Sequence, residues 1–390
     1  MIYLDNNATT PLDPRVLEAM LPFLREHYAN PSSPYAAGRA VRRAIDQARE
    51  QVAALLDCDP VEITFTGSGT EGDNAALASA AALAPQAAHL VTIATEHSAV
   101  LEPAHRWAAT GQRVTYLGVD RLGFPDLEKL RALLAAQPAT LVSAMWANNE
   151  TGLISPVAEI AALAHAHGAL FHTDAVQIVG KHPISLRQAQ IDYLSLSGHK
   201  FHAPKGIGAL YVSKRVRFQP WMLGGGQESG RRSGTENVAG IVGLGQAAAL
   251  MRQDLAEGGP ARIATLRDAF EAQILTTLPE TQINGDPTRR LPHTSSLTFP
   301  GIESAGLLIL LDEKGLACSA GSACHTGTLH PSHVLEAMGF DAEHARQTLR
   351  FSWSRLNTLE ETQRAAQLVI QCVQKMQRLH SGAGPVVMHT

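Results

Sequence analysis

The chain has 390 residues, 45% hydrophobic and 17% charged, a composition typical of a globular protein large enough for two domains. Its net charge of −4 gives no electrostatic reason to expect binding to nucleic acid or to an anionic membrane. Its four cysteines are too few for a disulfide framework and lack zinc-like C-x-x-C spacing, so no metal site is expected. The first residues lack a basic region and an apolar run, so no export is expected, and the Ala-rich run before Pro85 is too interrupted to span a bilayer; we therefore expect a cytoplasmic protein.

Two helices are expected near the start of the chain. Asp13 followed by Pro14 is a typical N-cap with proline in the first turn, and Ser33 with Pro34 repeats this pattern before an apolar stretch over 36–56. The turn-rich residues 28–33 would connect them.

Residues 62–212 alternate between short apolar, β-branched runs and helical stretches. This rhythm predicts an α/β domain with a mostly parallel sheet, in which ligands bind at the carboxyl ends of the strands. The expected strands are 63–65, 90–94, 114–117, 141–144, 170–171, 191–196 and 209–212.

A lysine and a carboxylate stand at the ends of two of these strands. Lys200 follows the strand-like run 191–196 beside Gly198, where partial burial would lower the pKa of its amine and make it nucleophilic. Asp174 ends the run that begins at Ala169. Pyridoxal phosphate chemistry needs such a pair, a lysine for the aldehyde and a carboxylate that keeps the pyridine nitrogen protonated.

Three turns after other strands contain polar residues that have both a structural and a functional interpretation. The small residues at 66–74 either connect a strand to a helix or close their N–H groups on a phosphate. His97 is either structural or stacks on an aromatic ring. Asn149 either forms a turn or donates an amide hydrogen bond to a phenolic oxygen.

The second part of the chain begins with a Gly-rich loop at 224–235, which we expect to be mobile or to contact another subunit, with Thr235 opening the next helix. Near 254–260 the helical pattern weakens and Gly and Pro residues appear, which predicts a boundary between two domains. Beyond it, a helix at 262–278, a strand at 295–299 and a final helix at 359–378, with a further helix and strand between them, predict a small α+β domain.

Two candidate functional residues lie in this second part. Cys324 is surrounded by Gly, Ser and Ala, which predicts an accessible thiol that is either reactive or an inert member of a small-residue turn. Cys318 is interpreted as a small buried hydrophobic residue. Arg350 alternates with apolar residues on a strand, where an inward guanidinium could bind a substrate carboxylate.

Nine motifs together resemble, in order and spacing, the cysteine desulfurases of the class V aminotransferase group. They are YLDNNATTP, TGSGTEGDN, EHSAV, NNETG, HTDAVQ, SLSGHK, RRSGT, SAGSAC and LRFS, and they extend from Tyr3 to about Glu361. The resemblance implies a pyridoxal-phosphate fold-type-I homodimer. Its large domain, at 13–256, would have a seven-stranded sheet, and its small α+β domain would combine 1–12 with 257–390.

The resemblance also implies a role for each candidate residue. Lys200 would be the cofactor-binding lysine, Asp174 the pyridinium partner, and His97 the stacking histidine that assists proton transfer. Cys324 would accept sulfur from L-cysteine as a persulfide and pass it to an acceptor protein. The remaining roles are contacts to O3′ from Asn149 and Gln177, a phosphate cup of Gly69, Thr70, Ser197, His199 and the second subunit's Thr235, and a substrate carboxylate site of Arg350 with Asn30.

The sequence departs from the family pattern at Tyr35, Ala320 and His325, and in the tail after Arg378. The sulfur acceptor is therefore open between iron–sulfur cluster assembly, transfer-RNA thiolation and DNA phosphorothioation. Two other functions also fit these residues. A class V aminotransferase or selenocysteine lyase would need no thiol, and a non-catalytic sulfur-relay subunit would need no cofactor.

Overall fold

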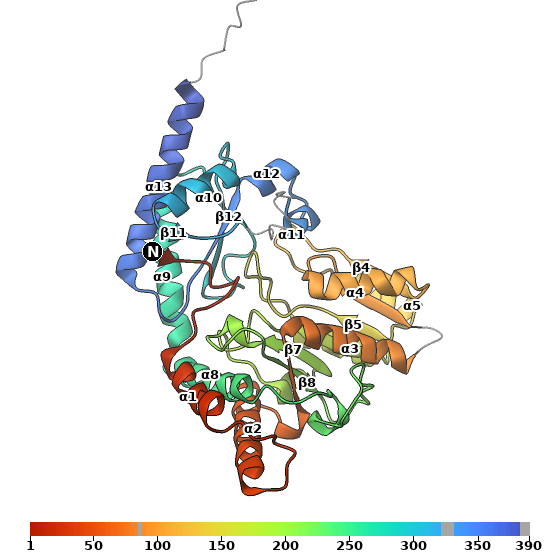
Figure 1. The fold of residues 1–390 in the computed structure, drawn as a ribbon. Helices are drawn as coiled ribbons and strands as arrows, with labels where there is room; N and C mark the ends of the chain where they lie inside the picture. Colours follow the sequence, from red (N-terminus) through yellow and green to blue (C-terminus); the bar gives the residue numbers. More distant parts are fainter. Residues whose placement is uncertain (85–87, 321–330, 383–390) are drawn as a thin grey trace, which may run out of the picture.

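The computed structural model describes residues 1–84, 88–320 and 331–382. A seven-stranded sheet forms the centre of the larger part, in the strand order β2-β8-β7-β6-β5-β3-β4 (Figure 1). Only β8 is antiparallel to its neighbours. The strands are β2 (Ile63–Thr66), β3 (His89–Ile93), β4 (Arg113–Leu117), β5 (Leu141–Ser143), β6 (Leu170–Asp174), β7 (Tyr193–Ser197) and β8 (Gly208–Val212).

Helices cover both faces of this sheet because alternate residues of its strands are apolar on opposite sides. Leu90 of β3 and Leu210 of β8 pack under α3 and α4, whereas their neighbours Val91 and Ala209 belong to the core on the opposite face. The helices of this domain are α1 (Pro14–Arg25), α2 (Ala36–Leu56), α3 (Gly69–Leu83), α4 (Ser98–Ala109), α5 (Leu127–Ala136), α6 (Val157–Ala166), α7 (Leu186–Ala189) and α8 (Val238–Ala256).

The smaller part has its own core around a three-stranded antiparallel sheet of order β12-β10-β9. Phe270 contacts Phe351 and Trp353 in this core, with ring centroids 4.8 and 5.1 Å apart. Its elements are α9 (Gly259–Thr277), β9 (Gln282–Ile283), β10 (Thr294–Thr298), α10 (Ser304–Glu313), β11 (Leu316–Ala317), α11 (His333–Ala337), α12 (Ala342–Arg346), β12 (Thr348–Ser352) and α13 (Leu359–Gly382).

The N-terminus contributes to this smaller part. β1 (Ile2–Tyr3) pairs in parallel with β11, and Leu4 is fully buried in the same core. The chain then crosses to the larger part, where Thr10 N donates to His199 O. The boundary expected near 256 falls in the short connection between α8 and α9.

Several local predictions were wrong. Thr235 does not open α8, because Asn237 Oδ1 accepts from Gly240 N and caps the helix at that point. The N-cap of α2 is Tyr35 rather than Ser33. Cys318 is only partly buried. Within the described residues, no helix has the length and apolar character needed to cross a membrane.

Candidate active site

A cavity of about 330 Å³ lies at the carboxyl ends of the parallel strands, where the α/β pattern predicts a ligand site. Residues from the turns after β2, β3, β5, β6 and β7 line it, together with Arg350 from β12 and Asn7 from the N-terminal segment. It brings together ten candidate residues, which are Gly69, Thr70, His97, Asn149, Asp174, Gln177, Ser197, His199, Lys200 and Arg350.

Lys200 lies in a single 3₁₀ turn (Gly198–Lys200) directly after β7. Its Nζ donates to the main-chain carbonyls of Asn7 at 2.6 Å and Ala8 at 2.9 Å. Burial, and then the positive charge of Arg350, lower the pKa of Lys200 to about 8, although Asp174 and Asp5 partly oppose this shift. A larger fraction of this amine than of an ordinary lysine is therefore neutral, and nucleophilic, near neutral pH.

Asp174 ends β6 and is only 6% exposed. Its Oδ1 accepts a hydrogen bond from Val176 N at 2.9 Å. Burial, followed by the negative charge of Asp73, raises the pKa of Asp174 to about 6. A buried carboxylate of this kind is stabilised by a cationic ring nitrogen.

The N-terminus of α3 forms a wall of the same cavity that Lys200 and Asp174 line. Ser68 caps the helix by accepting from Glu71 N at 3.1 Å, which leaves the first N–H groups of the helix available to an anion. A Cβ atom at Gly69 would lie 2.5 Å from Val176 Cγ2 and 3.3 Å from Ser197 Cβ. A side chain at position 69 would therefore fit only if Val176 shifted.

Two histidines lie beside this wall. His97 caps α4, and its Nδ1 accepts from Ala99 N at 3.0 Å, so the neutral ring carries its proton on Nε2. The Nδ1 of His199 lies 3.2 Å from Thr9 Oγ1. Burial, and then the charges of Lys200 and Lys205, lower the pKa of His199 to about 4, which keeps it neutral.

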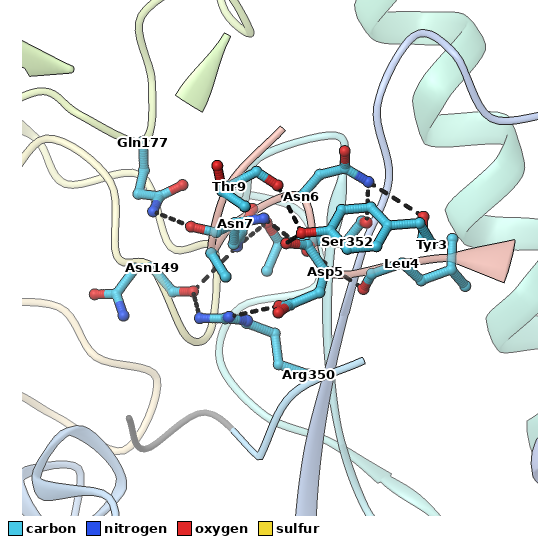
Figure 2. A network of polar contacts seen from close by, with 12 residues as sticks. Tyr3, Leu4, Asp5, Asn6, Asn7, Thr9, Asn149, Gln177, Arg350 and Ser352 are labelled. Atoms are coloured by element: carbon cyan, nitrogen blue, oxygen red, sulfur yellow. Dashed lines mark hydrogen bonds and ion pairs between the residues drawn. The ribbon is translucent and has the colours of Figure 1, made fainter. Parts of the chain in front are cut away.

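A polar network joins the remaining candidates to the N-terminal segment (Figure 2). Gln177 Nε2 donates to Asn7 O at 3.1 Å, and Asn149 O accepts from both Asn7 Nδ2 at 3.0 Å and Arg350 Nη1 at 2.9 Å. Arg350 Nη2 lies 2.9 Å from Asp5 Oδ1. Arg350 Nε is buried and has no partner among the described residues, so the guanidinium keeps N–H donors that these contacts do not use.

Two candidates do not line this cavity. Thr235 lines a separate hollow of about 180 Å³, together with Arg232 and Asn237. Asn30 is exposed, and its side chain accepts from Ser32 N at 2.8 Å. Within one chain, neither residue lies with the ten that form the cavity.

Cys324 lies outside the described residues, but the chain on both sides of 321–330 is bonded close to the cavity. Ser319 lines the cavity and pairs with the main chain of Arg350. On the other side, Ser332 Oγ donates to Glu150, and His333 Nε2 lies 2.9 Å from Glu96 O.

Sequence reasoning missed Asn7, Ala8 and Asp73, which also line the cavity. The contacts of Asn7 and Ala8 with Lys200 use main-chain carbonyls, which leave no signal in residue type. Asp73 is 1% exposed on α3, and burial raises its pKa to about 7. A carboxylate inside an Ala-rich helix is the signal that could have identified it.

A lysine, a buried carboxylate and a helix N-terminus at the carboxyl end of a mostly parallel sheet define an α/β enzyme site. The Aminotransferase class-V family profile matches residues 2–365. "Cysteine desulfurase" from Trichormus azollae is 47% identical over 379 residues, covering 97% of this chain and 94% of that protein. "Cysteine desulfurase NifS" from Azotobacter vinelandii is 46% identical over 389 residues, covering 99% and 96%.

Solved structures agree with this assignment. A structure titled "NIFS-LIKE PROTEIN" superposes with a TM-score of 0.89 at 38% identity, covering 96% of this chain and 99% of that one. DndA from Streptomyces lividans superposes with a TM-score of 0.76 at 36% identity, covering 90% and 99%. The chain belongs to the class V aminotransferase family, within its cysteine desulfurase group, and has the fold-type-I architecture expected from its sequence.

Proposed function

We propose that the protein is a pyridoxal-phosphate-dependent cysteine desulfurase that converts L-cysteine to L-alanine and transfers the sulfur to Cys324. The observation that carries the proposal is that Lys200, Asp174 and Arg350 line one cavity in a chain 47% identical to cysteine desulfurases. These residues supply an amine and a buried anion, which the cofactor requires, and a cation, which can bind the substrate carboxylate.

The residues present fit pyridoxal phosphate. Gly69 leaves no room for a side chain at the helix N-terminus, where a phosphate would bind with help from Thr70, Ser197 and His199. The cofactor supplies an aldehyde for an amine and a ring that accepts carbanion charge. In our proposal Lys200 would provide the amine, Asp174 would hold the proton on the ring nitrogen, His97 would stack on the ring, and Asn149 and Gln177 would contact its phenolic oxygen.

The protein's own groups carry the proton and sulfur transfers. Lys200 Nζ, once neutral, removes the Cα proton of the substrate, and the carbonyls of Asn7 and Ala8 stabilise the resulting ammonium. Arg350 binds the substrate carboxylate. The Cys324 thiolate attacks the substrate sulfur, so that a new S–S bond forms as the C–S bond breaks, and the three-carbon product leaves as alanine after protonation.

A second subunit is part of the proposal. The hollow that contains Thr235 is distinct from the cavity of its own chain, which supports a homodimer in which Thr235 completes the partner's phosphate site. Asn30 would approach the substrate carboxylate in the same assembly. The Gly-rich loop at 224–235 would then lie at the subunit contact.

The experiment that tests the function measures alanine and sulfide produced from L-cysteine by the loaded wild-type enzyme and by C324S. With an added thiol as the reductant that releases sulfide from the Cys324 persulfide, we expect equimolar products from the wild type and loss of both in C324S, with cofactor binding unchanged. Mercaptopyruvate in place of alanine, formed only when a keto acid is supplied as amino acceptor, would indicate an aminotransferase, and full turnover by C324S would remove the thiol from the mechanism. Selenocysteine as the only productive substrate would favour a selenocysteine lyase.

The acceptor of the sulfur is proposed to be a protein of iron–sulfur cluster assembly, transfer-RNA thiolation or DNA phosphorothioation. Pull-down with enzyme whose Cys324 has first been loaded by L-cysteine would identify it, and mass spectrometry of the captured protein would show whether the sulfur atom has moved.

A further inference from the structure

A partly buried amine with no role in the proposed chemistry lies behind the cavity. Lys181 follows Gln177 by four residues in the turns after β6, and its Nζ donates to Gln177 Oε1 at 3.3 Å. The backbone supports this arrangement, because Val179 N donates to Ala175 O and Lys181 N donates to Ile178 O.

The contacts of Gln177 determine which end of its carboxamide faces which neighbour. Asn7 O is an acceptor only, so Nε2 must be the atom 3.1 Å away. The oxygen then faces Lys181, whose amine can donate in either protonation state. Asn7 O also accepts from Lys200 Nζ at 2.6 Å, so one carbonyl links the two lysines through Gln177.

Lys181 occupies an electrostatically unfavourable position. Burial, and then the positive charges of Lys200 and Arg350, lower its pKa well below the usual value for lysine. Across the described ranges Lys181 has no ion pair, whereas Arg350 is paired with Asp5. A partly buried amine without a counter-ion among the described residues costs free energy, and the position would be more stable with an apolar residue unless the amine has another role.

We propose that Lys181 is a positioning residue for Gln177, holding the carboxamide oxygen so that Nε2 stays directed at Asn7 and the cavity. The inference rests on the proposed function, in which Gln177 contacts the phenolic oxygen of pyridoxal phosphate. A carboxamide whose oxygen already accepts a hydrogen bond is a stronger donor through its nitrogen, because linked hydrogen bonds polarise one another. Lys181 therefore strengthens the Gln177 contact as well as orienting it.

The first test compares pyridoxal phosphate affinity between variants by titrating unloaded protein. K181M keeps the length of the side chain but loses the donor, and we expect affinity to fall about tenfold, the scale of one positioned hydrogen bond. K181R keeps a donor and should recover most of the loss. The matched control is K214M, because Lys214 Nζ bonds the distant Asp59 at 2.6 Å and is exposed. It should bind as the wild type does.

A double-mutant cycle separates positioning from simple core packing. If Lys181 acts through Gln177, K181M should have little further effect on affinity once Q177M is present. A second readout needs no cofactor, since the side-chain amide resonances of Gln177 in the unloaded protein should shift in K181M and not in K214M.

Wild-type affinity in K181M, or an equal loss with and without Q177M, would overturn the inference. Failure of the proposed function gives a different result, because wild-type protein would then form no complex with pyridoxal phosphate.

Discussion

Arg350 Nη2 lies 2.9 Å from Asp5 Oδ1, and both groups act on the amine of Lys200. Arg350 lowers the pKa of Lys200 and Asp5 raises it. The N-terminal segment therefore does more than complete a small core. It holds the guanidinium proposed to bind substrate, and through Asn7 and Ala8 it holds the lysine as well.

Substitutions at these two positions should move the pKa of Lys200 in opposite directions. In the unloaded wild-type protein that pKa is about 8. D5N removes the charge that raises it, so more of the amine is neutral at a given pH. R350Q removes the charge that lowers it, so less is neutral. The measurement is the pH dependence of Lys200 labelling by an amine-specific reagent, quantified on its peptide. Shifts of the same sign in both variants would contradict this electrostatic coupling.

Replacing Asp174 should affect the cofactor rather than the fold. D174N keeps the shape of the side chain and can still accept from Val176 N, but it loses the charge that holds a proton on the ring nitrogen. We expect turnover of L-cysteine to fall by about 100-fold or more, the scale of a lost charge contact in an active site. Binding of pyridoxal phosphate to the unloaded wild-type protein should also weaken below about pH 6, where Asp174 becomes protonated in the unloaded protein. Undiminished activity of D174N would exclude this role.

The close approach at Gly69 predicts that even a methyl group is harmful. G69A would place Cβ 2.5 Å from Val176 Cγ2, and overpacking of this kind costs about 1–3 kcal/mol. We expect a lower melting temperature and weaker pyridoxal phosphate binding. Gly118 is the control, because a Cβ there meets no atom within 4 Å and its backbone does not have positive φ. If G69A and G118A behave alike, pyridoxal phosphate binding at the N-terminus of α3 does not depend on the close contact between position 69 and Val176.

A buried ion pair should matter for stability rather than for chemistry. Arg290 forms a bidentate pair with Glu271 of α9 at 2.7 and 2.6 Å, and the main chain on either side of Arg290 bonds the larger part near Gly152. Removing one partner leaves a buried charge, so E271Q should lower the free energy of unfolding by about 3 kcal/mol.

The control for this prediction is E303Q, whose carboxylate pairs with Arg346 at the exposed surface and should change stability by less than about 1 kcal/mol. Denaturant unfolding measures both variants. Equal effects would show that the buried pair contributes no more than the exposed one.

The sequence predicted all seven strands of the central sheet because each is a short β-branched or apolar run, and all but the edge strand β4 are mostly buried on both faces. It also placed Lys200 and Asp174 correctly at strand ends, where parallel strands bring distant residues to one edge. For these residues the burial of the strands produces both the apolar sequence pattern and the position of the strand ends at one edge of the sheet.

The rest depends on information that residue types do not carry. The contacts of Asn7 and Ala8 with Lys200 use main-chain oxygens, which any residue would provide. Thr235 and Asn237 are both good helix caps, and the Asn237 contact with Gly240 N decided between them. Lys181 has the character of an ordinary surface lysine, and only the folded chain reveals that it faces Gln177.

The most direct test of the account is the mass of the peptide that contains Cys324. It is measured after enzyme that carries pyridoxal phosphate has been mixed with L-cysteine in the absence of a reductant. We predict one added sulfur atom on Cys324, formed together with alanine and absent when Lys200 has first been fixed to the cofactor by borohydride. An unmodified Cys324 in enzyme that still produces alanine, or sulfur on Cys324 regardless of Lys200, would contradict it.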